Sequence, residues 1–82
     1  MKATVLVRPK GGILDPQGEA VERSLRQLGF EVGEARVGRV IDLEVDASNA
    51  EEARTQIERM CENLLANPLI ESYEIELEER GS

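Results

Sequence analysis

The sequence has 82 residues with 10 basic and 17 acidic side chains, which give a net charge of −7 at neutral pH. This length corresponds to one small domain with a modest core. The negative charge argues against a nucleic-acid-binding protein, because binding to phosphates depends on clustered lysine and arginine. One phenylalanine and one tyrosine also offer few rings on which single-stranded bases could stack.

Compartment and membrane association can also be judged from composition. No apolar run approaches the roughly 20 residues that cross a bilayer. The N-terminal residues pass directly into a strand-like alternation, without the apolar core of a secretory signal. A single cysteine, Cys61, excludes an internal disulfide framework. We therefore expect a cytoplasmic protein that does not bind membranes.

The first predicted elements are a strand and a helix. Residues 2–9 alternate between apolar and polar side chains, and Gly11-Gly12 ends that pattern. Asp15 and Pro16 then predict a helix start, because an aspartate caps free N–H groups and proline suits the first helical position. Gly29 predicts the end of this helix, as a residue that readily adopts the left-handed conformation.

Residues 31–46 predict a β-hairpin, in which Gly38, Arg39 and Val40 form the loop. This three-residue loop is favoured over a two-residue loop by the side chains that it places opposite each other. The resulting register pairs apolar with apolar and basic with acidic residues: Val37 with Ile41, Ala35 with Leu43, and Arg36 with Asp42.

A second helix and a last strand complete the chain. Ser48 and Glu51 form a capping-box pattern that predicts the helix start, and Asn67-Pro68 predicts its end. A strand follows, with its apolar side chains at every second position. The acidic residues of this strand and its tail are interpreted as a solvated face: Glu71, Glu74, Glu76, Glu78 and Glu79.

The predicted order is β-α-β-β-α-β, an α+β fold. Such a chain typically forms a four-stranded antiparallel sheet with two helices on one face, the ferredoxin-like arrangement. We expect a single domain over residues 1–79 and a flexible tail over residues 80–82. The second sheet face, which carries Leu6 and Val40, would stay open, and its edge strands would be unprotected. These features predict a homo-oligomer.

Few residues suggest catalysis or metal binding. The chain has no histidine, and Cys61 lies on the apolar stripe of the second helix without a basic neighbour. Gly11-Gly12 lies between a strand and a helix but lacks a phosphate-loop motif. The basic residues that could gather at one end of the sheet form either a docking surface for an anionic partner or ordinary surface charge: Arg8, Lys10, Arg36 and Arg39.

Three segments resemble the PurS subunit family of phosphoribosylformylglycinamidine (FGAM) synthase. The first is Arg8 to Val21, which contains L-D-P-Q-G. The second runs from Arg36 to Asp46, and the third from Cys61 to Glu71, which contains L-L-A-N-P. Together they cover most of the chain. The resemblance implies the PurS-like fold and a role in purine biosynthesis.

What the resemblance implies is a non-catalytic subunit that bridges a glutaminase subunit and a large synthetase subunit. The synthetase subunit would bind ATP, magnesium and formylglycinamide ribonucleotide, so this chain would hold no cofactor or metal itself. The complex would act as an ATP-dependent ligase, and the small subunit would help ammonia reach the synthetase site. Dimer and tetramer both remain open, as do strand exchange and a need for nucleotide in assembly. The expected partner-contact residues are Arg8, Lys10, Asp15, Gln17, Arg36 and Arg39.

Two other readings fit the same order of elements. Amino-acid-binding regulatory domains place effectors at dimer interfaces, but they normally accompany a catalytic domain. Small hydrolases of the acylphosphatase kind need a phosphate-cradling loop followed by an arginine, and the segment Gly11 to Leu14 supplies neither feature. The regulatory domain is the main alternative to the synthase subunit.

Overall fold

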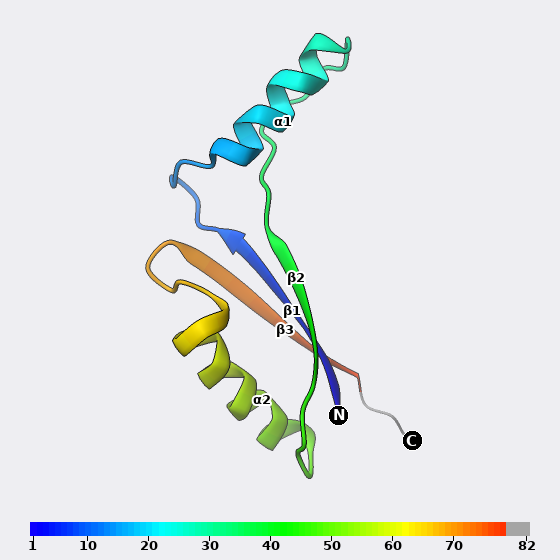
Figure 1. The fold of residues 1–82 in the computed structure, drawn as a ribbon, viewed down its shortest axis with the longest axis vertical. Coiled ribbons are helices and arrows are strands. Elements are labelled where there is room, and N and C mark those ends of the chain that lie inside the picture. The colour runs from blue at the N-terminus through cyan, green and yellow to red at the C-terminus, as the bar shows by residue number, and fades with distance from the viewer. Residues whose placement is uncertain (79–82) are drawn as a thin grey trace.

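The computed structural model describes residues 1–78, which form three strands, two α-helices and one π-helix (Figure 1). The predicted tail at residues 80–82 lies outside this range. In chain order the elements are β1 (Lys2–Pro9), α1 (Pro16–Gln27), β2 (Arg39–Glu44), α2 (Ala50–Met60), η1 (Cys61–Leu65) and β3 (Glu71–Glu78). The predicted first strand and the predicted start of the first helix are confirmed.

The three strands form an antiparallel sheet in the order β2-β1-β3. Val5 at the centre of β1 lies opposite Ile41 of β2 and Ile75 of β3. Because side chains alternate along each strand, these residues share one face, which we call the inner face. The outer face carries Leu6 and Val40, which lie opposite each other, and its other positions are mainly polar or charged, as the sequence predicted.

Helix α2 covers the inner face of the sheet on the side of β3. Ile57 of α2, Cys61 of η1, and Val5 and Val7 of β1 are the largest side chains that are fully buried. Burial of apolar area on this scale contributes about 25 cal/mol per Å², so this layer is the main source of stability. The core therefore lies between β1, β3 and α2.

The start of α2 differs in one residue from the prediction. Asn49, rather than Ser48, is the N-cap, and its side-chain oxygen accepts the Glu52 N–H at 2.8 Å. Asparagine and serine are similarly good caps, so local sequence does not separate them. The helix then continues through the π-turn η1 before the chain turns toward β3.

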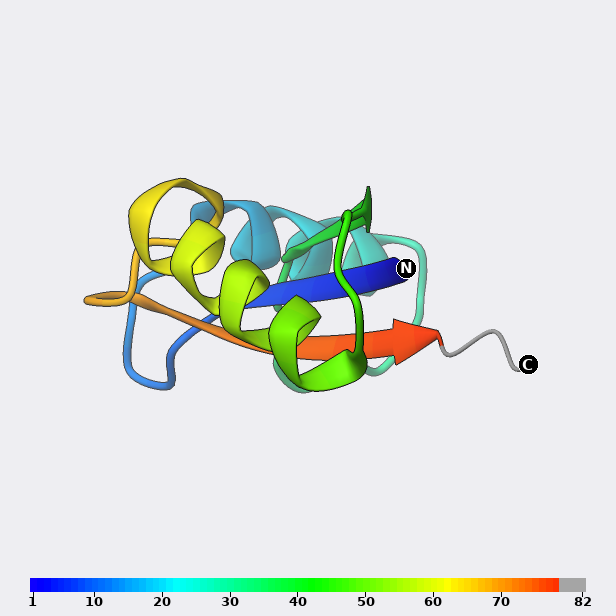
Figure 2. The same cartoon turned by 90° about the horizontal axis from the view of Figure 1, so that it is seen from below.

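The predicted β-hairpin is wrong for the single chain. Gly38 does not begin a reversal, and residues 31–38 run toward β2 without forming a strand. The sheet of one described chain therefore has three strands rather than four. Helix α1 lies beyond the end of this sheet, and α2 lies toward the other end of the molecule (Figures 1 and 2).

Helix α1 and residues 30–38 form one unit, which we call the arm. The Glu22 carboxylate accepts the Ala35 N–H at 3.1 Å, and Arg26 donates to the carbonyl oxygens of Val32 and Gly33 at 3.3 and 3.0 Å. Gly18 is buried because the Ala35 carbonyl approaches it closely, and a Cβ on Gly18 would collide with that oxygen. The arm is thus held together by side chains of the helix.

Candidate functional site

The loop between β1 and α1 is attached to the turn that precedes β3. The Lys10 N–H donates to the Ile70 carbonyl at 2.9 Å, and the Ile13 N–H donates to the Lys10 carbonyl at 3.2 Å. Gly12 has a φ of 84°, in the left-handed region where glycine carries no steric penalty. This end of the sheet therefore has a defined backbone, from which the Lys10 side chain extends into solvent.

Asp15 joins the start of α1 to the segment that leads into β2. Its Oδ1 accepts the Gly18 N–H at 3.1 Å, and its Oδ2 accepts the Val37 N–H at 2.8 Å. The hydrogen bonds from Val37 and Gly18 favour the ionised carboxylate and lower the pKa of Asp15, and the positive charge of Arg36 adds to this effect. Both carboxylate oxygens thus act within the chain.

Arg39 and Glu71 form a bidentate ion pair across the end of β1. Arg39 Nη1 lies 2.8 Å from Glu71 Oε2, and Nη2 lies 3.0 Å from Oε1. Arg39 Nη2 also donates to the Leu65 carbonyl at 2.7 Å, and Glu71 Oε1 accepts the Asn67 N–H at 2.7 Å. This hydrogen bonding lowers the pKa of Glu71 and raises that of Arg39. The guanidinium therefore fixes the start of β2 to the turn after η1.

The prediction that Glu71 belongs to the solvated face is wrong. Glu71 shares the inner-face parity of Tyr73 and Ile75, and its side chain is only 19% exposed. This parity is visible in the sequence, since Glu71 lies two residues before Tyr73. Glu22 and Arg26, which hold residues 33–35 against α1, were not identified from the sequence. Their hydrogen-bond partners are backbone groups of a segment without a periodic pattern.

The structure brings together three of the six predicted contact residues. Asp15, Gln17 and Arg39 line a cavity of about 260 Å³ at the end of the sheet, together with Glu71. The other lining residues are mainly apolar: Pro9, Ile13, Leu14, Val37, Gly38 and Ile70. Leu14 is 74% exposed at its rim. This cavity and the Lys10 loop form the candidate site for partner contact.

The two other basic residues predicted for contact, Arg36 and Arg8, lie on different surfaces. Arg36 is exposed and close enough to Asp15 to influence its pKa. Arg8 instead points to the outer face, where its Nη1 lies 3.3 Å from Glu74 Oε1 in an exposed ion pair. The predicted cluster of four basic side chains at one end of the sheet is therefore divided between two surfaces, and a contact role for each residue stays a prediction.

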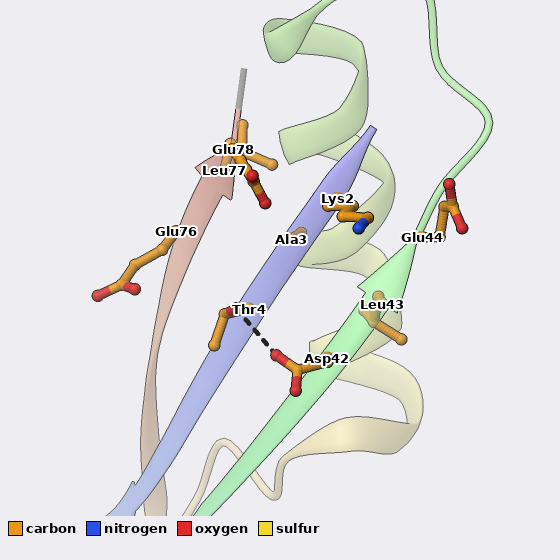
Figure 3. Close-up of a pocket in the computed structure, with 9 residues that line it drawn as sticks. All are labelled: Lys2, Ala3, Thr4, Asp42, Leu43, Glu44, Glu76, Leu77 and Glu78. Atoms are coloured by element: carbon orange, nitrogen blue, oxygen red, sulfur yellow. Dashed lines mark hydrogen bonds between the residues drawn. The ribbon is translucent and has the colours of Figure 1, made fainter. Parts of the chain in front are cut away.

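A larger groove, of about 720 Å³, crosses the other end of the sheet (Figure 3). Lys2 and Thr4 of β1 lie at its centre, with Asp42 and Glu44 of β2 on one side and Glu76 of β3 on the other. The Thr4 hydroxyl donates to Asp42 Oδ1 at 3.0 Å. The groove is open and acidic, and no residue in it has the paired base that would activate Thr4 as a nucleophile.

Cys61 and Tyr73 lie under α2, on the inner side of the molecule. Burial, with the negative charges of Glu62 and Glu58 nearby, raises the pKa of the Cys61 thiol, which disfavours the reactive thiolate. The Tyr73 hydroxyl donates to Glu62 Oε2 at 2.8 Å, and this hydrogen bond with burial raises the pKa of Tyr73 to about 12. Both groups are thus held in their neutral forms, as packing residues.

Among residues 1–78, no group of three histidine, cysteine, aspartate or glutamate side chains is arranged to hold a metal ion. In the same residues, no helix combines the length and the hydropathy that a membrane crossing requires.

Comparison with known proteins connects this geometry to a family. The family model for PurS, described as phosphoribosylformylglycinamidine (FGAM) synthase, matches residues 2–79. The PurS subunit of that synthase from Methanocaldococcus jannaschii is 42% identical over 78 residues, which cover 94% of each chain. The PurS subunit from Bacillus subtilis is 39% identical over 79 residues, covering 95% of this chain and 93% of that one.

Solved structures agree with the sequence comparison. The crystal structure of M. jannaschii PurS, a subunit of formylglycinamide ribonucleotide amidotransferase, is similar with a TM-score of 0.84 and 41% identity over 98% of both chains. A chain in the structure of PurLQS from Thermotoga maritima has the same TM-score and 41% identity, over 92% of this chain and 93% of that chain. The α+β fold class is thereby confirmed, and the chain belongs to the PurS family of FGAM synthase subunits.

Proposed function

We propose that this chain is the small non-catalytic subunit of an FGAM synthase in purine biosynthesis, where it bridges a glutaminase subunit and a synthetase subunit. The observation that supports this most strongly is the full-length similarity to PurS chains, one of them in PurLQS from T. maritima. In this proposal, the synthetase subunit binds ATP and magnesium, the complex acts in the cytoplasm, and this chain assembles with itself as well as with its partners.

The proposed mechanism is the protection of ammonia during transfer. Ammonia released into water near neutral pH is mostly protonated and then no longer nucleophilic. A subunit that holds the glutaminase and synthetase sites in register keeps the transfer path closed to water, and this raises turnover without contact to a substrate. The buried thiol of Cys61 and the internally bonded carboxylate of Asp15 fit a chain that acts by docking.

Within the candidate site, the residues differ in how free they are to dock. Arg39 and Asp15 are bound within the chain, whereas the exposed side chains of Lys10 and Gln17 have no hydrogen bond in the described residues. Lys10 and Gln17 are therefore the contact residues that we propose first. Leu14 adds apolar area beside them, as expected of an interface whose centre is apolar and whose rim is polar.

The test is reconstitution with the synthetase and glutaminase subunits of the same organism. Amidine formation is measured with glutamine and, separately, with free ammonia, in the presence and absence of this chain. We expect the chain to be required with glutamine and dispensable with ammonia. Equal glutamine-dependent turnover with and without the chain would refute the bridging role.

A paired variant then tests the site. We expect Lys10→Glu with Gln17→Ala to reduce glutamine-dependent turnover several-fold, while the ammonia-dependent rate stays unchanged. Lys2→Glu, which also reverses one exposed lysine but in the groove at the far end of the sheet, is the matched control. An equal effect of both changes would assign the loss to net charge rather than to the site.

A further inference from the structure

Exposed apolar side chains gather in the two loops that follow β1 and precede β3. Leu14 of the first loop and Leu69 of the second are 74% and 85% exposed. A backbone hydrogen bond of 2.9 Å joins the loops, and both lie on the same side of the molecule in the two perpendicular views (Figures 1 and 2). Single exposed leucines are ordinary on a protein surface, but a group of apolar side chains in joined loops indicates an interaction site. The members of this group, which we call the apolar tip, are Ile13, Leu14, Leu69 and Ile70.

The turn that carries Leu69 has a fixed backbone. The Asn67 carbonyl accepts the N–H groups of Ile70 and Glu71 at 3.0 and 2.7 Å. The Asn67 side-chain oxygen accepts the Leu69 N–H at 3.2 Å. The Glu71 carboxylate closes the turn by accepting the Asn67 N–H at 2.7 Å, and Arg39 holds that carboxylate in place. A rigid turn loses little conformational entropy on binding, so an exposed side chain on it is well suited to enter a partner surface.

The charges around the candidate site have a small positive excess, although the whole chain carries −7. Lys10, Arg36 and Arg39 outnumber the two acidic residues, Asp15 and Glu71. Both carboxylates are taken up by hydrogen bonds within the chain. The exposed ammonium of Lys10 forms no ion pair among residues 1–78. An apolar surface with a basic border fits a partner surface that is apolar at its centre and acidic at its rim.

The two catalytic subunits of the proposed complex place different demands on a neighbouring surface. The synthetase subunit must gather two anions, ATP and a ribonucleotide, so a positive potential around its site favours their entry. The glutaminase subunit takes glutamine, which has no net charge, and it is free of that demand. An apolar tip with a basic border is therefore complementary to the glutaminase subunit rather than to the synthetase subunit.

We propose that the apolar tip docks on the glutaminase subunit, where Leu14 and Leu69 enter an apolar hollow with an acidic rim. Lys10 lies at the edge of this contact and pairs with a carboxylate of the rim. Arg39 and Glu71 act as positioning residues, because they hold the turn that presents Leu69. This inference rests on the proposed bridging function and adds to it one surface and its partner.

Photo-crosslinking in the reconstituted complex identifies what the tip contacts. The complex is assembled from the synthetase and glutaminase subunits of one organism and this chain with benzoylphenylalanine in place of Leu69. The matched control carries the same group in place of Leu28, which is 73% exposed at the far end of α1 (Figure 1). We expect the Leu69 variant to crosslink to the glutaminase subunit and the Leu28 variant not to.

Other crosslinking products would contradict the proposal. If the Leu69 variant joins the complex but crosslinks mainly to the synthetase subunit, to a second copy of this chain or to nothing, the proposal is overturned. Failure of the bridging function is seen separately, with the unmodified chain. It would then neither join the complex nor be required for glutamine-dependent turnover.

Titration of activity separates weaker docking from loss of fold. Leu69→Gln should raise the concentration of this chain that gives half-maximal glutamine-dependent turnover roughly tenfold, while the maximal rate is unchanged. Leu69→Met keeps an apolar side chain and should behave like the unmodified chain. Leu28→Gln, the matched control, should change the half-maximal concentration by less than about twofold. An unchanged half-maximal concentration for Leu69→Gln overturns the proposal.

Discussion

At the scale of single residues, the ion pair of Arg39 and Glu71 connects segments that are far apart in the sequence. We expect Arg39→Ala to lower the free energy of unfolding by about 1 kcal/mol, because the pair is bidentate but partly exposed to solvent. Urea denaturation measures the change. Exposed Arg23 provides the control, since Arg23→Ala should change stability by less than about 0.5 kcal/mol.

A double-mutant cycle with Glu71→Gln tests whether the pair itself is responsible. If the effects of Arg39→Ala and Glu71→Gln simply add, the two side chains do not interact, and the structural role of the pair is refuted.

Tyr73 allows a direct pKa measurement, because it is the only tyrosine and the chain has no tryptophan. Its pKa of about 12 lies above the ordinary value of 10.0. The neutral phenol therefore stabilises the fold fully below pH 10, and this stabilisation is lost as the pH rises toward 12. Tyrosinate absorbance after a rapid pH jump should show the raised midpoint, and Glu62→Gln should lower it. A midpoint near 10 in the unmodified protein would contradict the hydrogen bond.

The stabilising effect of Asp15 is lost at acid pH, whereas that of Tyr73 is lost at alkaline pH. Its pKa in the folded chain is below the ordinary 3.8, so its stabilising effect is present above that pH and is lost as the pH falls through the lower value. We expect Asp15→Asn to lower the thermal midpoint at pH 6 and to have a much smaller effect at pH 3. If Asp15→Asn changed the thermal midpoint by the same amount at pH 6 and pH 3, the charge of Asp15 would not be involved in stability.

At the scale of elements, Gly18 decides how closely α1 approaches residues 30–38. A methyl group at this position would collide with the Ala35 carbonyl and the Asp15 carboxylate. We expect Gly18→Ala to displace the arm and to expose the Ala35 and Val37 N–H groups to hydrogen exchange. Gly11→Ala is the matched control, because no atom lies within 4 Å of the added carbon. Equal exchange in both variants would show that close packing at Gly18 is unnecessary.

The elements themselves were largely predictable from local sequence. Alternation in residues 2–9 and the Asp15-Pro16 start depend on neighbouring residues alone, and both are confirmed. The course of the chain at Gly38, where a hairpin was wrongly predicted, could not be derived in this way. A glycine permits a turn but does not require one, and whether residues 31–38 fold back depends on what else can occupy the edge of β2.

The candidate site was predictable only in part, for a similar reason. Asp15, Gln17 and Arg39 were among the six contact residues predicted from the sequence, and the structure brings these three together around one cavity. The ion pair of Arg39 with Glu71 could not be predicted from the sequence, because a contact across β1 depends on the strand order β2-β1-β3. Arg8 lies on the outer face, as its alternation with Thr4 and Leu6 predicted, and it pairs there with Glu74 instead of joining the cavity.

At the scale of the whole molecule, self-association should make stability depend on protein concentration. If folded dimers form and unfolded chains are monomeric, the thermal midpoint rises with concentration. Scanning calorimetry over a hundredfold concentration range measures this rise. A constant midpoint would indicate that the measured species is a monomer.

The side-chain hydrogen bonds that hold residues 30–38 against α1 also limit uncontrolled pairing of strand edges. The side chains of Asp15, Glu22 and Arg26 bind backbone groups of residues 33–37. These groups are then not free to pair with another strand on that side of the arm. The outer strand β3 carries Glu74, Glu76 and Glu78, whose like charges repel a second β3 strand. These two features are devices by which a chain with unpaired strand edges avoids growing into fibres.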